Sequence, residues 1–136
     1  ARELGLEGRA RFTGFVSDRT RDELLAGSRL AVCASPKEGW GITVIEANAA
    51  GTPVVARDAP GLRDSVRHGE TGLLVAGDRV EGFAEAIARL LSDDGLSLRM
   101  SRAALAWSKQ FGWDRAASEM AEAIDQARAG ADGPGP

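Results

Sequence analysis

Hydrophobic residues in this chain gather in short continuous runs that are separated by segments with helical spacing. None of the runs alternates with polar residues, which favours strands covered on both faces, as in a parallel sheet. The runs span residues 30–34, 54–56 and 73–75. A further strand is predicted over residues 11–16, which contain Phe12 and end in Phe15 and Val16. The pattern therefore predicts about four strands.

Helices are predicted before and between these strands, because apolar residues there recur on one face. They span residues 18–26, 42–50, 61–67 and 80–91. Ser17 or Asp18 can cap the first helix, whose Leu24 and Leu25 are expected to face the core. Gly51 follows the second helix, at a position where a left-handed cap is favoured.

The last of these helices has the clearest pattern, and Asp78 with Glu81 is expected to form its capping box. Strands that alternate with helices predict an α/β domain with a Rossmann-like parallel sheet and flanking helices. A complete doubly wound nucleotide domain has about five or six strands, so the predicted sheet is incomplete at its N-terminal side. Residues 1–6 read like the end of a helix stopped by Gly5 or Gly8, and we expect the chain to enter a domain midway.

The last third of the chain is predicted to be helical throughout. Two apolar stripes run along it, one before Gly112 and one after. The first consists of Leu96, Met100, Ala103, Trp107 and Phe111, and the second of Trp113, Ala117, Met120 and Ile124. Contact between Trp113 and Phe111 is expected to set the angle between the two helices. Residues 129–136 contain no core-forming side chain and are predicted to be a disordered tail, which leaves residues 1–128 for the domain.

Composition narrows the function classes. The chain has 136 residues, enough for one domain with a core, and its 17 basic and 20 acidic residues give a net charge of −3. This balance argues against nucleic acid as a partner. Cys33 is the single cysteine and is expected to be a small buried residue in a reducing compartment. No apolar run approaches the ~20 residues that span a bilayer, so we expect a cytoplasmic protein with at most peripheral membrane association.

The segment from Ser35 to Gly51 has the residues of an anion site. Pro36 ends the preceding strand, and Gly39 and Gly41 allow loop conformations that other residues avoid. The first amides of the following helix lack carbonyl partners and carry partial positive charge. The amides of Gly41, Ile42 and Thr43, together with the Thr43 hydroxyl, can therefore hold a phosphate.

Two carboxylates flank this helix end. Glu46 can accept both hydroxyls of a ribose, and Glu38 can accept hydroxyls of a second sugar. A phosphate between two diol acceptors has the outline of a sugar nucleotide. A plainer interpretation stays open, in which the glycines form only a turn and Glu46 only offsets the helix dipole. The glycine spacing is not the dinucleotide-binding fingerprint, because no third glycine follows at the required position.

The residues Glu38-Gly39-Trp40-Gly41-Ile42-Thr43-Val44-Ile45-Glu46-Ala47 resemble the Glu-seven-residues-Glu motif of retaining glycosyltransferases with the GT-B fold. The closest resemblance is to glycosyltransferase family 4, the group 1 transferases. Further segments resemble successive strands, turns and the Phe-x-Trp of that family. They are residues 12–16, 51–56, 61–64, 69–75 and 111–113.

This resemblance implies an enzyme of two Rossmann-like domains, of which the chain is most of the C-terminal, donor-binding one. It implies that Glu38 is catalytic and contacts the transferred sugar, and that Glu46 binds the nucleotide ribose. The residues Gly39, Trp40, Gly41, Ile42 and Thr43 would support the sugar and diphosphate, and Phe15 and Val16 would border the base. The implied reaction moves a sugar from a nucleoside diphosphate to an acceptor hydroxyl with retention, without metal or cofactor.

The same resemblance implies parts that the sequence does not contain. The Arg and Lys that clamp the diphosphate in the family, and the N-terminal domain that binds a glycan, lipid or small-molecule acceptor, would precede Ala1. The 136 residues are therefore expected to be catalytically inactive alone and to bind donor weakly at best. Alternatives are a non-catalytic nucleotide-sugar-binding or partner-binding domain of GT-B fold, which would be expected to have lost Glu38 or Glu46, and a GT-B epimerase or phosphorylase.

Other polar and aromatic residues have simpler expected roles. His68 lies in a polar turn and is expected at the surface, and Trp107, Phe111 and Trp113 are expected to pack rather than stack on a base. Arg57 and Asp58 follow a strand at the same edge as the motif, so both a ligand contact and a structural role are open. For the loop residue Lys37, attraction of phosphate and simple solvation are both open.

Overall fold

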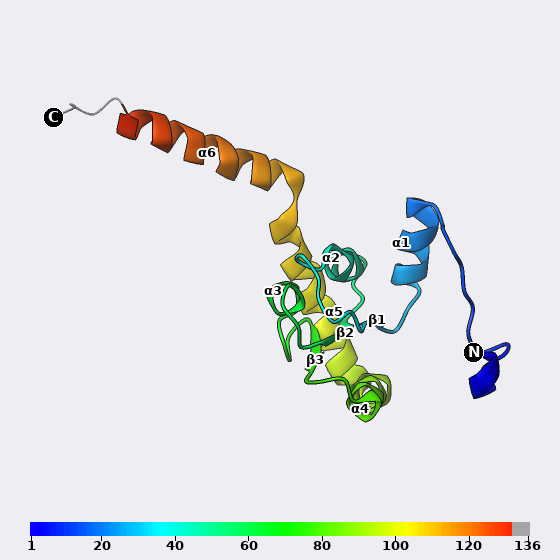
Figure 1. The fold of residues 1–136 in the computed structure, drawn as a ribbon. Coiled ribbons are helices and arrows are strands. Elements are labelled where there is room, and N and C mark those ends of the chain that lie inside the picture. The colour runs from blue at the N-terminus through cyan, green and yellow to red at the C-terminus, as the bar shows by residue number, and fades with distance from the viewer. Residues whose placement is uncertain (132–136) are drawn as a thin grey trace.

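The centre of the chain is a parallel sheet, seen in a computed structural model that describes residues 1–131 (Figure 1). In this part of the chain the sheet has three strands in the order β1-β2-β3, with β1 at Ala31–Cys33, β2 at Val54–Arg57 and β3 at Gly72–Val75. Val55 pairs with Val32 on one side and with Leu73 on the other. The parallel sheet is confirmed, whereas the predicted fourth strand is not formed.

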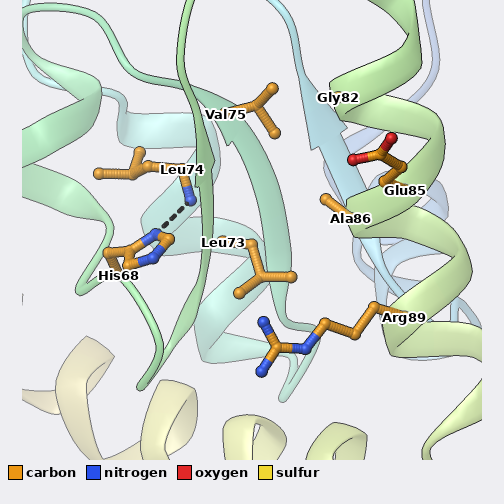
Figure 2. Close-up of a pocket in the computed structure, with 8 residues that line it drawn as sticks. All are labelled: His68, Leu73, Leu74, Val75, Gly82, Glu85, Ala86 and Arg89. Carbon is orange, nitrogen blue, oxygen red and sulfur yellow. Dashed lines mark hydrogen bonds between the residues drawn. The ribbon is translucent and has the colours of Figure 1, made fainter.

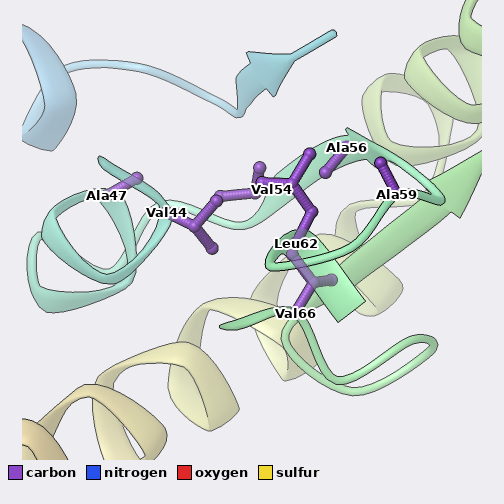
Figure 3. Close-up of a cluster of buried hydrophobic side chains, with 7 residues drawn as sticks. All are labelled: Val44, Ala47, Val54, Ala56, Ala59, Leu62 and Val66. Carbon is purple, nitrogen blue, oxygen red and sulfur yellow. The ribbon is translucent and has the colours of Figure 1, made fainter. Parts of the chain in front are cut away.

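The central strand β2 explains why the apolar runs do not alternate. Val54, Val55 and Ala56 are all buried, because successive side chains enter different hydrophobic layers on the two faces of the sheet. Figure 3 shows the layer that receives Val54 and Ala56. It is completed by Val44, Ala47, Ala59, Leu62 and Val66. The opposite layer receives Val55 together with Leu73, Val75, Leu90, Leu96 and Met100.

Helices cover both faces of the sheet. The α-helices are α1 (Asp18–Ala26), α2 (Ile42–Ala49), α3 (Leu62–Ser65), α4 (Val80–Ser92), α5 (Asp94–Ser108) and α6 (Trp113–Ala131), and the 3-10 helices are η1 (Arg2–Leu4) and η2 (Lys109–Phe111). Helices α2 and α3 supply the layer with Val54, and α4 and α5 supply the layer with Val55. The predicted helices are confirmed, although the third is shorter than the 61–67 expected.

The N-terminal segment differs from its prediction. Residues 11–16 form no strand, and Phe12 and Phe15 are exposed. A strand needs a partner for its backbone groups, and none of the strands in residues 1–131 pairs with this segment, which lies apart from the sheet in Figure 1. Leu24 is likewise exposed, so α1 packs on the core through Leu25 only. Val32 is exposed and Cys33 is only half-buried, contrary to the prediction of a covered strand and a buried cysteine, because β1 is an edge strand of the described sheet.

The C-terminal helix leaves the body of the domain (Figure 1). Its apolar stripe is present in the sequence but is not packed, since Trp113 is 90% exposed and Met120 and Ile124 are exposed too. Trp113 is therefore not packed beside Phe111, contrary to the prediction. Helix α6 continues to Ala131 and so includes the first residues of the predicted tail. The rest of that tail lies outside the described residues.

The predicted capping box of α4 is also not formed. Arg79 is the N-cap and makes no side-chain capping hydrogen bond. Asp78 instead forms an ion pair with Arg57 of β2, and Glu81 lies 3.6 Å from Arg79. An opposite charge on a neighbouring strand end attracts the carboxylate more strongly than a neutral backbone amide does. The N-cap of α1 is confirmed, because the Ser17 side chain accepts a hydrogen bond from the Thr20 amide at 3.2 Å.

Asn48 of α2 is completely buried, and neither polar atom of its side-chain amide has a partner in residues 1–131. An unpaired buried polar group costs about 1–3 kcal/mol, whereas leucine has the same number of side-chain heavy atoms and no polar group to desolvate. We expect Asn48→Leu to raise the free energy of unfolding by about 1 kcal/mol in urea denaturation. Asn48→Asp, which buries a charge, should lower the free energy of unfolding. A less stable Asn48→Leu would contradict the interpretation that the buried Asn48 amide is unpaired.

Candidate functional site

The glycine-rich loop between β1 and α2 lies at the carboxyl edge of the sheet, where strand ends and helix N-termini meet. The loop rests on the chain that leaves β2. The Glu38 amide donates a hydrogen bond to the Pro60 carbonyl at 3.4 Å, and a side chain at Gly61 would overlap the Glu38 carbonyl. Gly61 also has a φ of 81°. The position of Glu38 therefore depends on a glycine that the chain reaches 23 residues later (61 − 38 = 23).

The N-terminus of α2 is open. Val44 and Ile45 donate the first helical hydrogen bonds to the Gly41 carbonyl, at 2.9 and 3.4 Å, and no side chain caps the helix. The amides of Ile42 and Thr43 precede these bonds and have no backbone acceptor in residues 1–131. Gly41 has a φ of 82°, and a Cβ there would lie 2.6 Å from the Ser65 hydroxyl. The backbone can thus offer two unpaired donors to an anion.

The two acidic residues have different surroundings. Both Glu38 and Glu46 are half-buried, but Glu46 also forms an ion pair with Arg21 of α1, whose Nη1 lies 3.1 Å from its Oε1. Sequence reasoning missed Arg21, because no local pattern links the first helix to the second. Only the contact between α1 and α2 in the folded chain brings the two charges together.

Trp40, Ile42 and Glu46 line one hollow of about 580 Å³ beside the outer face of α2. Its opposite wall comes from the joint between α5 and α6. The residues on that wall are Ser108, Lys109, Phe111, Gly112, Trp113 and Ala116. Glu38 does not line this hollow, so the structure brings Glu46, but not Glu38, to it.

Successive contacts between three aromatic rings hold Trp40 against the body of the domain. The ring of Trp40 meets Phe111 edge-on at 4.6 Å between centroids, and Phe111 meets Trp107 at 4.8 Å. Trp107 donates from Nε1 to the Ser65 carbonyl at 2.9 Å, and the Arg67 guanidinium lies 3.9 Å from its ring centroid. Trp107 and Phe111 therefore pack as predicted, and they support the loop that contains Trp40.

Ion pairs also form at the charged residues that follow β2 at this edge. Arg57 pairs with Asp78, and Asp58 accepts a hydrogen bond from Arg63. This bond and the charge of Asp58 raise the pKa of the Arg63 guanidinium above its usual value. Arg57 and Asp58 therefore take part in ion pairs within the domain, and a ligand contact of either residue stays a prediction.

The residues expected at the base are placed less closely. Phe15 is fully exposed and Val16 is half-buried just before the N-cap Ser17. Neither lines the hollow beside α2, and their contact with a base stays a prediction. Lys37 is exposed in the loop, next to Glu38.

A second hollow of about 310 Å³ lies between β3 and α4 (Figure 2). His68 lines it, and its Nδ1 accepts a hydrogen bond from the Leu74 amide at 2.9 Å. His68 is exposed as predicted and fastens its turn to β3. Residues 1–131 contain no group of three His, Cys, Asp or Glu side chains that could hold a metal ion. None of the helices in that range has the length and apolar character needed to cross a membrane.

Residues 1–107 match the family model described as glycosyl transferases group 1. A D-inositol 3-phosphate glycosyltransferase of Corynebacterium glutamicum is 39% identical over 130 residues, which are 93% of this chain and 30% of that protein. The one of Kribbella flavida is 41% identical over 117 residues, 84% of this chain and 27% of that protein. The chain thus spans about 30% or less of the length of these relatives.

Solved structures also resemble the chain. A sucrose-phosphate synthase of Thermosynechococcus elongatus superimposes with a TM-score of 0.86 at 30% identity, covering 95% of this chain and 33% of that one. Anabaena HepE in complex with UDP superimposes with a TM-score of 0.84 at 30% identity, covering 92% and 34%. HepE has also been solved with UDP-glucose, with a TM-score of 0.82, the same identity and the same coverage.

Proposed function

The chain belongs to the group 1 glycosyltransferases, and from this premise we propose that it binds the nucleoside diphosphate sugar from which the enzyme takes the sugar. Its sheet and flanking helices are part of a GT-B fold, as the sequence motif predicted. The observation that carries the proposal is the open N-terminus of α2, which offers unpaired amides at the carboxyl edge of a parallel sheet.

The diphosphate is proposed to lie against the amides of Gly41, Ile42 and Thr43. In the transfer, the bond from the anomeric carbon to the diphosphate oxygen breaks and its electron pair stays on that oxygen. A bond from the anomeric carbon to the acceptor hydroxyl oxygen forms, and the proton of that hydroxyl passes to the leaving diphosphate. The leaving diphosphate gains negative charge as the bond breaks. Amides fixed at a helix N-terminus stabilise that charge more strongly in the transition state than in the bound substrate.

The two acids have separate proposed roles. Glu46 accepts hydrogen bonds from the ribose hydroxyls, and Glu38, on the loop held by Gly61, accepts them from the transferred sugar as the catalytic residue of this chain. Gly39 and Trp40 shape the loop at the sugar. We propose transfer with retention at the anomeric carbon and without metal or cofactor, in keeping with the family that the motif resembles.

The complete reaction involves more than these residues. Because the chain spans about 30% of the relatives' length, binding of a glycan, lipid or small-molecule acceptor is proposed to lie outside it. We expect no sugar transfer by the 136 residues alone, and a cytoplasmic location for the enzyme.

A calorimetric titration of the chain with UDP and UDP-glucose tests the proposal. Hydrogen bonds to charged groups contribute about 1.5–3 kcal/mol, so Glu46→Gln should weaken both ligands about tenfold or more. Glu38→Gln should weaken UDP-glucose while leaving UDP unchanged, because UDP carries no sugar for Glu38 to bind. Because the proposal names no particular base, GDP and ADP and their sugars are titrated in parallel with UDP and UDP-glucose.

Glu23→Gln is the matched control, because Glu23 is also paired with an arginine, at 2.9 Å, but lies on the exposed face of α1. It should bind like the unmodified chain. Absence of saturable binding of every nucleotide at millimolar concentration, with the chain folded, would overturn the proposed function.

A further inference from the structure

Arg21 makes the contact between α1 and α2 that reaches the proposed ribose acceptor. Its Nη1 lies 3.1 Å from Oε1 of Glu46, and the two side chains are 38% and 29% exposed. The contact is therefore partly shielded from water, unlike an ordinary surface ion pair. Among the described residues 1–131, Arg21 is the one ion-pair partner of Glu46.

The guanidinium is held in place by its own helix. Its Nε and Nη2 donate to Oδ1 of Asp22 at 3.1 and 2.9 Å, and Nη1 donates to Oδ1 of Asp18 at 3.2 Å. The hydrogen bond with Asp22 raises the pKa of Arg21, and the charges of Glu46, Asp22 and Asp18 add to this effect. Arg21 thus presents a fixed positive charge to Glu46 rather than a freely moving one.

Arg19 of the same helix provides a contrast. Its Nε donates to Glu23 at 2.9 Å within α1, and both side chains are mostly exposed. Arg19 and Arg21 are therefore both arginines of α1 that pair with an acidic side chain. They differ in that Arg21 reaches across to α2.

We propose that Arg21 is a positioning residue for Glu46, an inference that rests on the proposed function. The positive charge of Arg21 beside Oε1 restricts the rotation of the carboxylate, and the two carboxylate oxygens keep lone pairs for the two ribose hydroxyls. Arg21 acts through Glu46 and touches no ligand itself. Its contribution therefore appears as preference for a ribose with both hydroxyls, rather than as affinity for the diphosphate.

The test compares UDP with 2′-deoxy-UDP by calorimetry in the unmodified chain, Arg21→Ala, Arg21→Lys and Arg19→Ala. We expect the unmodified chain and Arg19→Ala to prefer UDP by about tenfold, as for one hydrogen bond to a charged group. Arg21→Ala should lose most of that preference, because UDP loses the contacts of both hydroxyls with Glu46 whereas 2′-deoxy-UDP has only the 3′-hydroxyl to lose and is weakened less. Arg21→Lys, which restores a single charge, should recover part of it. Circular dichroism of each variant verifies the fold.

Three results would contradict the inference. If Arg21→Ala keeps the full preference for UDP, Arg21 does not position Glu46. If it weakens both nucleotides equally, Arg21 attracts the diphosphate or stabilises the domain instead, and recovery in Arg21→Lys separates these two explanations. If the folded, unmodified chain binds neither nucleotide at millimolar concentration, the proposed function fails and the inference fails with it.

Discussion

Gly61→Ala is expected to lower the free energy of unfolding by about 2–5 kcal/mol and to abolish nucleotide-sugar binding. Two effects add at this position. The φ of 81° is strained for any residue with a Cβ, and the new methyl group would overlap the backbone of Glu38 and Gly39. A backbone neighbour cannot rotate away as a flexible side chain can, so the loop with Glu38 has to move.

Gly69→Ala is the matched control for this prediction. Gly69 has a φ of 83°, but nothing lies within 4 Å of a Cβ built there. It should therefore cost only the backbone strain, about 1–2 kcal/mol, and leave UDP-glucose binding unchanged. Urea denaturation and calorimetric titration of both variants provide the comparison. Equal losses in the two variants would mean that the contact between Gly61 and the Glu38 loop does not hold the site.

The parts of the fold that could be predicted are those that depend on neighbouring residues in the chain. The run Val54–Ala56 has to be buried on both faces wherever it pairs, so its strand follows from composition alone. Ser17 caps α1 through an amide only three residues away. Gly41 precedes α2 directly, so an open helix N-terminus could be anticipated from the sequence.

The parts that could not be predicted depend on pairing between distant residues. Residues 11–16 have the composition of a strand, but strand formation requires a partner, and none pairs with them in the described structure. Asp78 stands at a capping position, yet it pairs with Arg57 of another element. The approach of Gly61 to Glu38 and the pairing of Arg21 with Glu46 likewise arise only when the chain folds. In each of these cases, a contact between residues distant in the sequence either overrides the local preference or creates an arrangement for which no local signal exists.

The same distinction applies to α6. Its apolar stripe has correct helical spacing and the helix forms, but spacing alone does not say what the stripe contacts. The aromatic residues on the two sides of Gly112 show the contrast. Phe111 lies between Trp40 and Trp107, whereas Trp113, two positions later, is almost fully exposed. The residues that support the loop between β1 and α2 therefore lie before Gly112, in α5 and η2.

Trp107→Ala should lower the free energy of unfolding by about 3 kcal/mol and weaken UDP-glucose binding as a secondary effect. The substitution removes the hydrogen bond to Ser65, the ring beneath Arg67 and the edge contact with Phe111. Phe111 then loses the support that fixes Trp40 in the loop beside Glu38. Trp107→Phe keeps the ring and loses the hydrogen bond, so it should cost about 1 kcal/mol and retain binding.

Trp113→Ala is the control for removing a tryptophan. Since Trp113 is 90% exposed, its loss should change stability by less than about 0.5 kcal/mol. Urea denaturation followed by circular dichroism avoids relying on tryptophan fluorescence, and titration with UDP-glucose measures the second effect. A destabilised Trp107→Ala that binds UDP-glucose with unchanged affinity would show that the aromatic contacts stabilise the domain without positioning the loop that contains Trp40. Weakened binding in Trp107→Ala, with Trp107→Phe unaffected, would establish that packing 67 residues along the chain from Trp40 (107 − 40 = 67) sets the geometry of the donor site.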